Sequence, residues 1–184
     1  MDKNKIYISS VQASIEEYYE EILSIIFNTG WSIAKSSKEL RSLGEEALRE
    51  IFLPAINAKH KGAATGETYN KDGKTDILVR IDGEDILIAE CKFWEGENHL
   101  KKTLDQLLGY ATVRDIQLAM LIFSRNKKFT EVKQKILPAI KQHPSFGREV
   151  NIDLEKGWYQ LLISHPDDQA CELTLTIMAF HISS

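Results

Sequence analysis

The chain has 184 residues, of which 43% are hydrophobic and 27% charged, a composition typical of a folded protein rather than a disordered one. Its length suits one domain spanning residues 1–184. The 23 Lys and Arg residues and 27 Asp and Glu residues give a net charge of −4. This charge argues against a protein that coats nucleic acid by bulk attraction, but it allows a local basic groove around an acidic site.

The cysteines and the apolar segments indicate the compartment. Cys91 and Cys171 are far apart in the sequence and form no disulfide framework, which favours a reducing environment. The N-terminal segment has no apolar signal region, and no apolar run approaches the length of a membrane span. We therefore expect a cytoplasmic protein that does not associate with a membrane.

Two helices are predicted in the first third of the chain. Apolar residues recur at helical spacing over residues 10–28, and Gly30 is expected to end that helix. A second helix is expected over residues 37–58, with Ser37 as its N-cap. Pro54 lies inside this second helix, so we expect a kink or an early end there.

A β-hairpin is predicted after the second helix. A short β-prone segment at 67–70 and turn-forming residues at 71–74 precede it. Apolar runs at 76–81 and 85–94 then flank an Asp-Gly pair, which is typical of a tight hairpin turn. The centre of the second run is apolar at every position, so we expect this strand to be covered on both faces.

Helices and strands alternate in the rest of the chain. A helix over 98–114, capped by its first residue, is followed by a strand at 118–124 that we expect to lie parallel to the strand before the helix. A helix at 129–142 and an antiparallel pair of strands at 157–164 and 171–182 complete the pattern. The predicted fold is mixed α/β, with a sheet of about five or six strands flanked by helices.

Three charged residues on the predicted hairpin indicate a site. Glu90 and Lys92 are two positions apart, so on a strand their side chains point to the same face, and Asp76 on the partner strand can reach the same point. They lie near the carboxyl end of a buried strand, where open α/β sheets usually place their sites. Two carboxylates beside a lysine form a hard-oxygen site suited to Mg²⁺ or Mn²⁺ and to phosphodiester hydrolysis.

The alternative is an ordinary Glu–Lys ion pair on a solvated strand, which explains most short motifs of this kind. The apolar residues on both sides of Glu90 and Lys92 count against it. Burying a carboxylate and an ammonium without partners costs several kcal/mol, so a functional role explains their presence better.

The spacing of these residues resembles that of the PD-(D/E)XK nuclease superfamily, whose members have the restriction-endonuclease-like fold. The matching residues are Gly73, Lys74, Thr75 and Asp76, followed after an interval by Glu90, Cys91 and Lys92. Thr75 stands where the family name has proline, at a position that is not a metal ligand. Glu45 and Arg49, with the residues at 52–54, are similar to the opening helix of the nuclease domain in type I restriction motor subunits.

The resemblance covers about residues 40–125. It does not extend to the N-terminal helical extension, residues 1–36, or to the C-terminal antiparallel strands, residues 147–184. We therefore assign no role to these two segments from sequence.

The resemblance implies a role for each matching residue. Asp76, Glu90 and Glu45 would bind Mg²⁺, with Mn²⁺ as a substitute, and the backbone carbonyl of Cys91 would complete the ligand set. Lys92 would be the catalytic lysine. These assignments make the chain a Mg²⁺-dependent phosphodiesterase.

Helix geometry separates the two candidate glutamates and adds two polar residues. Glu45 flanks the apolar stripe of its helix, whereas Glu46 points nearly opposite and is expected to be solvated. Gln106 and Tyr110 are four residues apart on a later helix and match the Q-x-x-x-Y element of exonuclease branches of the superfamily. They would hold Lys92 or a substrate phosphate; alternatively, they are polar edge residues of a packed helix.

The sequence thus predicts a metal-dependent nuclease, an endonuclease acting on DNA in restriction, defence or repair. It would act as a homodimer or in association with a larger targeting protein. Basic residues at 125–128, after the strand at 118–124, could track phosphates near the site. Two alternatives stay open: a non-catalytic nucleic-acid-binding or assembly module on the same fold, and an RNA-directed nuclease.

Overall fold

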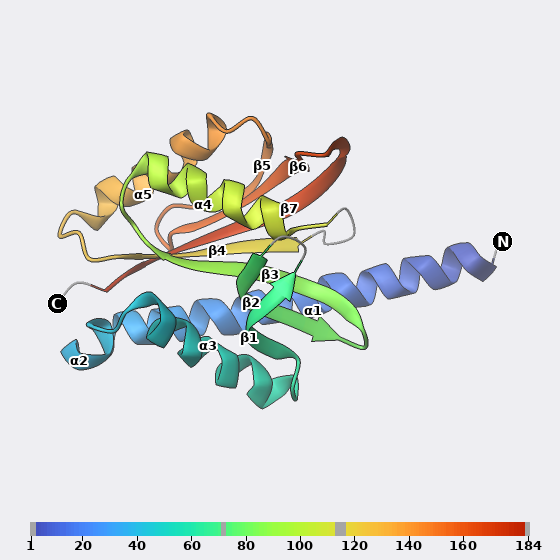
Figure 1. The fold of residues 1–184 in the computed structure, drawn as a ribbon, viewed down its shortest axis with the longest axis horizontal. Coiled ribbons are helices and arrows are strands. Elements are labelled where there is room, and N and C mark those ends of the chain that lie inside the picture. The colour runs from blue at the N-terminus through green and yellow to red at the C-terminus, as the bar shows by residue number, and fades with distance from the viewer. Residues whose placement is uncertain (1–2, 71–72, 113–116, 183–184) are drawn as a thin grey trace.

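The computed structural model describes residues 3–70, 73–112 and 117–182. Within these residues the helices and strands follow in the order α1 Lys3–Ala34, α2 Lys38–Arg41, α3 Glu45–Lys59, β1 Ala64–Asn70, β2 Gly73–Ile81, β3 Glu84–Phe93, α4 Glu97–Tyr110, β4 Gln117–Ser124, α5 Phe129–Lys141, β5 Phe146–Asp153, β6 Trp158–His165 and β7 Asp168–His181. Figure 1 shows these elements arranged around one sheet.

The described strands form a mixed sheet of seven strands in the order β1-β2-β3-β4-β7-β6-β5. Strand β4 is parallel to both β3 and β7, and the other neighbours are antiparallel. The mixed α/β class, the parallel pair and the C-terminal antiparallel pair are confirmed. The prediction of five or six strands is low because β5 is largely exposed and has no apolar run that would mark it as a strand.

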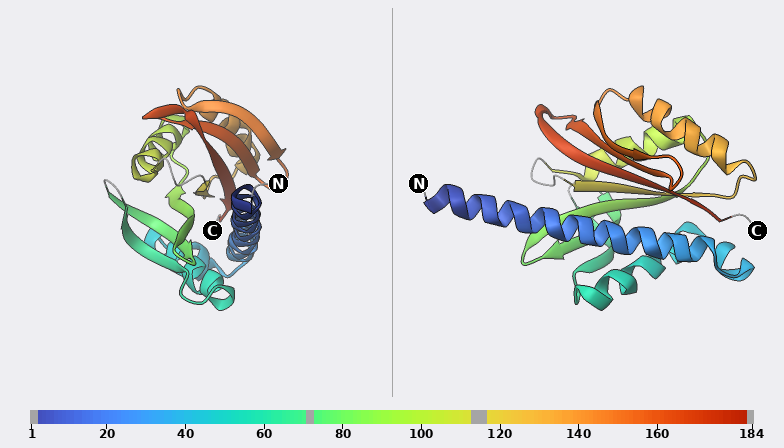
Figure 2. Two further views of the ribbon diagram at one scale, coloured as in Figure 1. Left: turned by 90° about the vertical axis from the view of Figure 1, so that its right-hand side faces the viewer. Right: turned by 180° about the vertical axis from the view of Figure 1, so that it is seen from behind.

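Helices cover both faces of this sheet, as the two views in Figure 2 show. Helices α1 and α3 pack on one face, in a core that includes Ile22, Phe52 and Phe123. Helices α4 and α5 pack on the other face, in a second core that includes Leu104 and Ile136. The middle of β3 is buried on both faces, as its uninterrupted apolar run predicts.

The prediction that Gly30 ends the first helix is wrong, because α1 continues to Ala34. Gly30 is instead a contact position within the helix. A Cβ at this residue would lie only 2.3 Å from Cζ of the Phe180 ring on β7. The glycine therefore allows α1 to approach the sheet, and a helix-ending role is not needed to explain it.

The predicted second helix is in fact two helices. Ser37 does cap the short helix α2, where its hydroxyl accepts a 3.5 Å hydrogen bond from the Leu40 amide. Helix α3 then begins only at Glu45, after Gly44, and it passes through Pro54 without ending there. Burial of Phe52 before the proline and of Ile56 after it offsets the lost backbone hydrogen bond, so packing overrides the expected break.

The hairpin turn and helix α4 differ from prediction only in detail. Asp82 and Gly83 both have positive φ, 52° and 88°, as a tight two-residue hairpin turn requires. Helix α4 follows Gly96 and not Asn98, and it ends at Tyr110. The predicted end of this helix at residue 114 and the first half of the turn predicted at 71–74 lie outside the described residues. The second half of that turn prediction is wrong, because Gly73 and Lys74 belong to strand β2.

In the described part of the chain, no helix is both long enough and apolar enough to cross a membrane. Helix α1 has the necessary length. However, it carries several charged side chains on its solvent-facing side, including Glu16, Glu17 and Glu20.

We expect Gly30→Ala to lower the free energy of unfolding by about 1–3 kcal/mol, because the added methyl group would overlap the Phe180 ring. That ring lies between Phe27 and Phe123, so it has little room to move. The measurement is urea unfolding followed by circular dichroism. Gly109→Ala in α4 is the control: a Cβ there has open space, so this change should raise stability by up to about 1 kcal/mol. Equal stabilisation by both changes would contradict the proposed contact.

Candidate functional site

The candidate site lies where strand β2 separates from strand β3. The two strands pair from Ile81 and Glu84 as far as Ile77 and Ala89, where the ladder ends in the described residues. Strand β3 continues to Phe93 beside β4. Its edge toward β2 is therefore open over its last residues, and main-chain N–H groups on that edge need other partners.

Two carboxylates take the place of the missing strand. Oδ2 of Asp76 accepts a 2.8 Å hydrogen bond from the Cys91 amide, and Oε1 of Glu45 accepts a 2.7 Å hydrogen bond from the Phe93 amide. The Asp76 amide in turn donates to Oε1 of Glu90 at 3.3 Å. The main chain of β3 thus fixes the positions of the acidic side chains.

Lys92 lies at the centre of these carboxylates. Its Nζ is 3.2 Å from Oε2 of Glu90, 3.6 Å from Oδ2 of Asp76 and 4.0 Å from Oε2 of Glu45. The Lys92 side chain is 19% exposed, so substrate could still reach it. One ammonium thus faces three carboxylates, and this group of side chains, which we call the acidic cluster, has an excess of negative charge.

Helix α4 supplies the remaining predicted residues. Nε2 of Gln106 donates to Oε2 of Glu90 at 3.1 Å and lies 2.8 Å from the hydroxyl of Tyr110. Their spacing of four residues places both on one side of the helix. The structure therefore brings Gln106 into direct contact with the acidic cluster, with Tyr110 behind it.

Arg49 is a member of the site to which the sequence analysis assigned no role. Its buried guanidinium is 3.4 Å from Oδ1 of Asp76 and also pairs with Glu50 and Glu67. It follows Glu45 by four residues on α3, a spacing that places both side chains on one face and could have identified it. Arg49 holds Asp76 from the side opposite to Lys92.

Cys91 contributes its main chain and not its thiol. The thiol is fully buried in the core below α1 and α3, on the face of β3 opposite to Glu90. Burial raises the pKa of this thiol, and the nearby Asp76 carboxylate raises it further. A reactive thiolate is therefore not part of the site.

The environment shifts two of the pKa values. Burial, together with the nearby Asp76 carboxylate, raises the pKa of Glu90 to about 7, and Lys92 offsets only part of this. For Lys92, burial alone would lower the pKa, but the Asp76 and Glu90 carboxylates outweigh it and hold the pKa above its usual value. Lys92 is therefore charged at neutral pH, whereas Glu90 is poised to gain or lose a proton.

The donor atoms fit a hard divalent cation in kind. Within the described ranges, no three His, Cys, Asp or Glu side chains are grouped so that they could hold a metal ion by themselves. The acidic cluster nevertheless offers carboxylate oxygens, the ligands that Mg²⁺ and Mn²⁺ prefer. Its excess negative charge and the raised pKa of Glu90 are both relieved by a bound cation.

Comparisons with known protein families, with curated proteins and with solved structures gave no match for this chain. Functional inference therefore depends on the residues and contacts described above.

The raised pKa of Glu90 predicts a pH dependence of stability. The folded state binds the Glu90 proton more tightly than the unfolded state. The stabilisation that comes from this proton is therefore fully present below about pH 4.5 and is lost as the pH rises through about 7. Glu90→Gln removes this titration. The difference in unfolding free energy between pH 5 and pH 8 should therefore shrink by about 2–3 kcal/mol relative to wild type.

Urea unfolding at several pH values checks this expectation. Glu46→Gln is the matched control, because Glu46 is exposed on α3 and should leave the wild-type pH profile unchanged. Parallel pH profiles for wild type and Glu90→Gln would show that Glu90 does not titrate in this range.

Proposed function

We propose that this protein is a metal-dependent nuclease that hydrolyses phosphodiester bonds, with DNA as its substrate, in restriction, defence or repair. The observation that supports this most directly is the convergence of Asp76, Glu90 and Glu45 on Lys92 at the open edge of β3. We place the activity in the cytoplasm, where both free cysteines stay reduced.

Each residue of the site has a role under this proposal. Asp76, Glu90 and Glu45, with the Cys91 carbonyl, would hold Mg²⁺ or Mn²⁺. The bound cation supplies charge neutralisation at the phosphate and a lower pKa of the attacking water. Lys92 donates a hydrogen bond to the attacking water or to the phosphate oxygens as negative charge develops there.

Residues around the cluster act as positioning groups. Gln106 fixes the Oε2 atom of Glu90, and Tyr110 fixes Gln106. Arg49 holds Oδ1 of Asp76, which leaves the orientation of that carboxylate fixed between two cations. Such support matters because small displacements of catalytic groups cost large factors in rate.

A structural ion-pair cluster explains these contacts less well. Burying Glu90 next to Asp76 raises the energy of its charged form, as the elevated pKa records. An apolar residue in this position of β3 would avoid that cost, because β3 is otherwise apolar in its buried part. A charge that destabilises the fold at neutral pH calls for a functional reason.

One observation favours a second candidate, a non-catalytic nucleic-acid-binding or assembly module. Lys92 already contacts three carboxylates, so the cluster can exist as a closed ion-pair network without a cation. Under either candidate the partners are nucleic acid and, in addition, a second copy of the chain or a larger targeting protein.

The first test is cleavage of supercoiled plasmid, linear duplex DNA, single-stranded DNA and RNA with Mg²⁺ or Mn²⁺. We expect Lys92→Ala to lower the cleavage rate at least about 100-fold, because it removes a charged donor from the transition state. Glu45→Gln should raise the Mg²⁺ concentration needed for half-maximal cleavage, because it removes a proposed metal ligand. Glu46→Gln, at its exposed neighbour on α3, is the matched control. Lys156→Ala controls for the loss of an exposed lysine that does not contact the acidic cluster.

The outcomes separate the candidates. Metal-dependent cutting of DNA that is lost in Lys92→Ala supports the nuclease, whereas cutting of RNA alone identifies an RNA-directed enzyme. If wild type and Lys92→Ala bind nucleic acid equally and neither cuts it, the non-catalytic module is the better description.

A further inference from the structure

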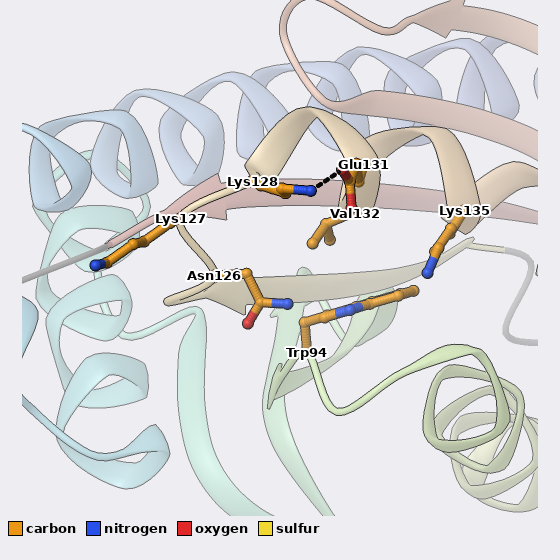
Figure 3. A pocket seen from close by; sticks show the side chains of 7 residues that line it. All are labelled: Trp94, Asn126, Lys127, Lys128, Glu131, Val132 and Lys135. Carbon is orange, nitrogen blue, oxygen red and sulfur yellow. Dashed lines mark ion pairs between the residues drawn. The ribbon is translucent and has the colours of Figure 1, made fainter.

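A pocket of about 390 Å³ lies at the carboxyl ends of β3 and β4, and one of its lining residues, Trp94, follows Lys92 of the acidic cluster by two positions. It is lined by Trp94, directly after β3, by residues of the loop after β4 and by the first turns of α5, as Figure 3 shows. Its lining residues are Trp94, Asn126, Lys127, Lys128, Glu131, Val132 and Lys135. We propose that this pocket, here called the Trp94 pocket, binds one unpaired nucleotide next to the phosphate that the acidic cluster would cleave.

Trp94 links the pocket to the acidic cluster. It follows Lys92 by two residues in a chain that continues the direction of β3, so the two side chains leave the same face and their Cα atoms are about 7 Å apart. The Trp94 amide donates a 2.7 Å hydrogen bond to the Phe123 carbonyl, which continues the pairing with β4 and fixes the position of this residue. A strand of nucleic acid whose phosphate reached Lys92 would therefore have its neighbouring nucleotide within reach of Trp94.

The Trp94 ring is suited to stacking with a base. It is half-buried: one part packs against the core below α4 and α5, and another part lines the pocket. In Figure 3 the ring lies across the pocket opposite Val132 of α5. The part of the indole that lines the pocket is an aromatic surface of the kind on which nucleobases stack.

The charge of the Trp94 pocket is opposite to that of the acidic cluster. Three lysines line it against one glutamate, and that Glu131 is already paired with Lys128 at 2.9 Å. Among the described residues, no carboxylate forms an ion pair with Lys127 or Lys135. These two ammonium groups are therefore available for the phosphates on either side of a bound nucleotide.

Together these features favour nucleic acid over an acidic protein segment. An acidic peptide would satisfy the lysines but would gain little from the indole, whereas a nucleotide uses both. The base must be unpaired, because a base inside a continuous duplex has no free face for Trp94. The inference rests on the proposed nuclease function for its placement beside a reacting phosphate, and it adds a preference for single-stranded, overhanging or frayed ends.

Binding in EDTA tests the pocket without any cleavage. Fluorescence anisotropy is measured with fluorescein-labelled dT₁₂ and with a blunt duplex of the same length. We expect wild type to bind dT₁₂ more tightly than the duplex. Trp94→Leu should weaken dT₁₂ binding about tenfold and duplex binding much less, because only stacking is lost. Trp94→Phe, which keeps an aromatic ring, should restore most of the preference.

The lysines are tested separately, since both are exposed and should not affect folding. Lys127→Gln combined with Lys135→Gln should weaken binding of both probes and lower the slope of log affinity against log salt by about 1.4 for the single strand. Lys38→Gln combined with Lys156→Gln removes the same charge elsewhere and should leave both quantities unchanged. A poly-glutamate competitor should not displace dT₁₂ from wild type at equal charge concentration.

The inference is overturned if Trp94→Leu and Trp94→Phe bind dT₁₂ equally well, or if wild type shows no preference over the duplex. Displacement by poly-glutamate would likewise show that the lysines recognise charge alone. These results are distinct from failure of the proposed function. Loss of cleavage in Lys92→Ala with unchanged dT₁₂ binding in Trp94→Leu would leave the nuclease standing without this subsite, and ring-dependent binding without cleavage would do the reverse.

Discussion

The site depends on the early separation of β2 from β3. A strand that loses its neighbour exposes main-chain N–H groups, and leaving them unpaired in a buried position costs about 1–3 kcal/mol each. In this protein the Cys91 and Phe93 amides are satisfied by carboxylates from β2 and from the first residue of α3. The same two hydrogen bonds therefore satisfy the main chain of β3 and hold the acidic side chains in place.

Electrostatics then sets the properties of the cluster. Burial of Glu90, together with the nearby Asp76 carboxylate, disfavours the charged form of Glu90, and Lys92 offsets only part of this. The Arg49 guanidinium stabilises the charged form of Asp76, but it also pairs with the Glu50 and Glu67 carboxylates on the outer side. The result is a pre-formed region of negative potential that favours a cation, held in place by hydrogen bonds and not by the cation itself.

Much of the fold follows from local sequence patterns, and the exceptions have identifiable causes. The hairpin at Asp82 and the buried strands β3 and β4 are strong patterns because turn chemistry and apolar runs coincide there. The role of Gly30 depends on the Phe180 ring, which lies far away in the sequence, and β5 has almost no apolar signal. In the site, spacing along one strand relates Glu90 to Lys92, but only the packing of α3 against the sheet brings Arg49 to Asp76.

The parallel arrangement of β3 and β4 explains why an acidic cluster and a basic pocket are neighbours. Parallel strands end at the same edge of the sheet, so the residues after β3 and the loop after β4 meet there. Had β4 run antiparallel to β3, its lysine-rich loop would lie at the opposite edge, far from Lys92. The crossover through α4 therefore does more than cover the sheet. It carries Gln106 to Glu90 and returns the chain in the direction that places Lys127 and Lys135 beside Trp94.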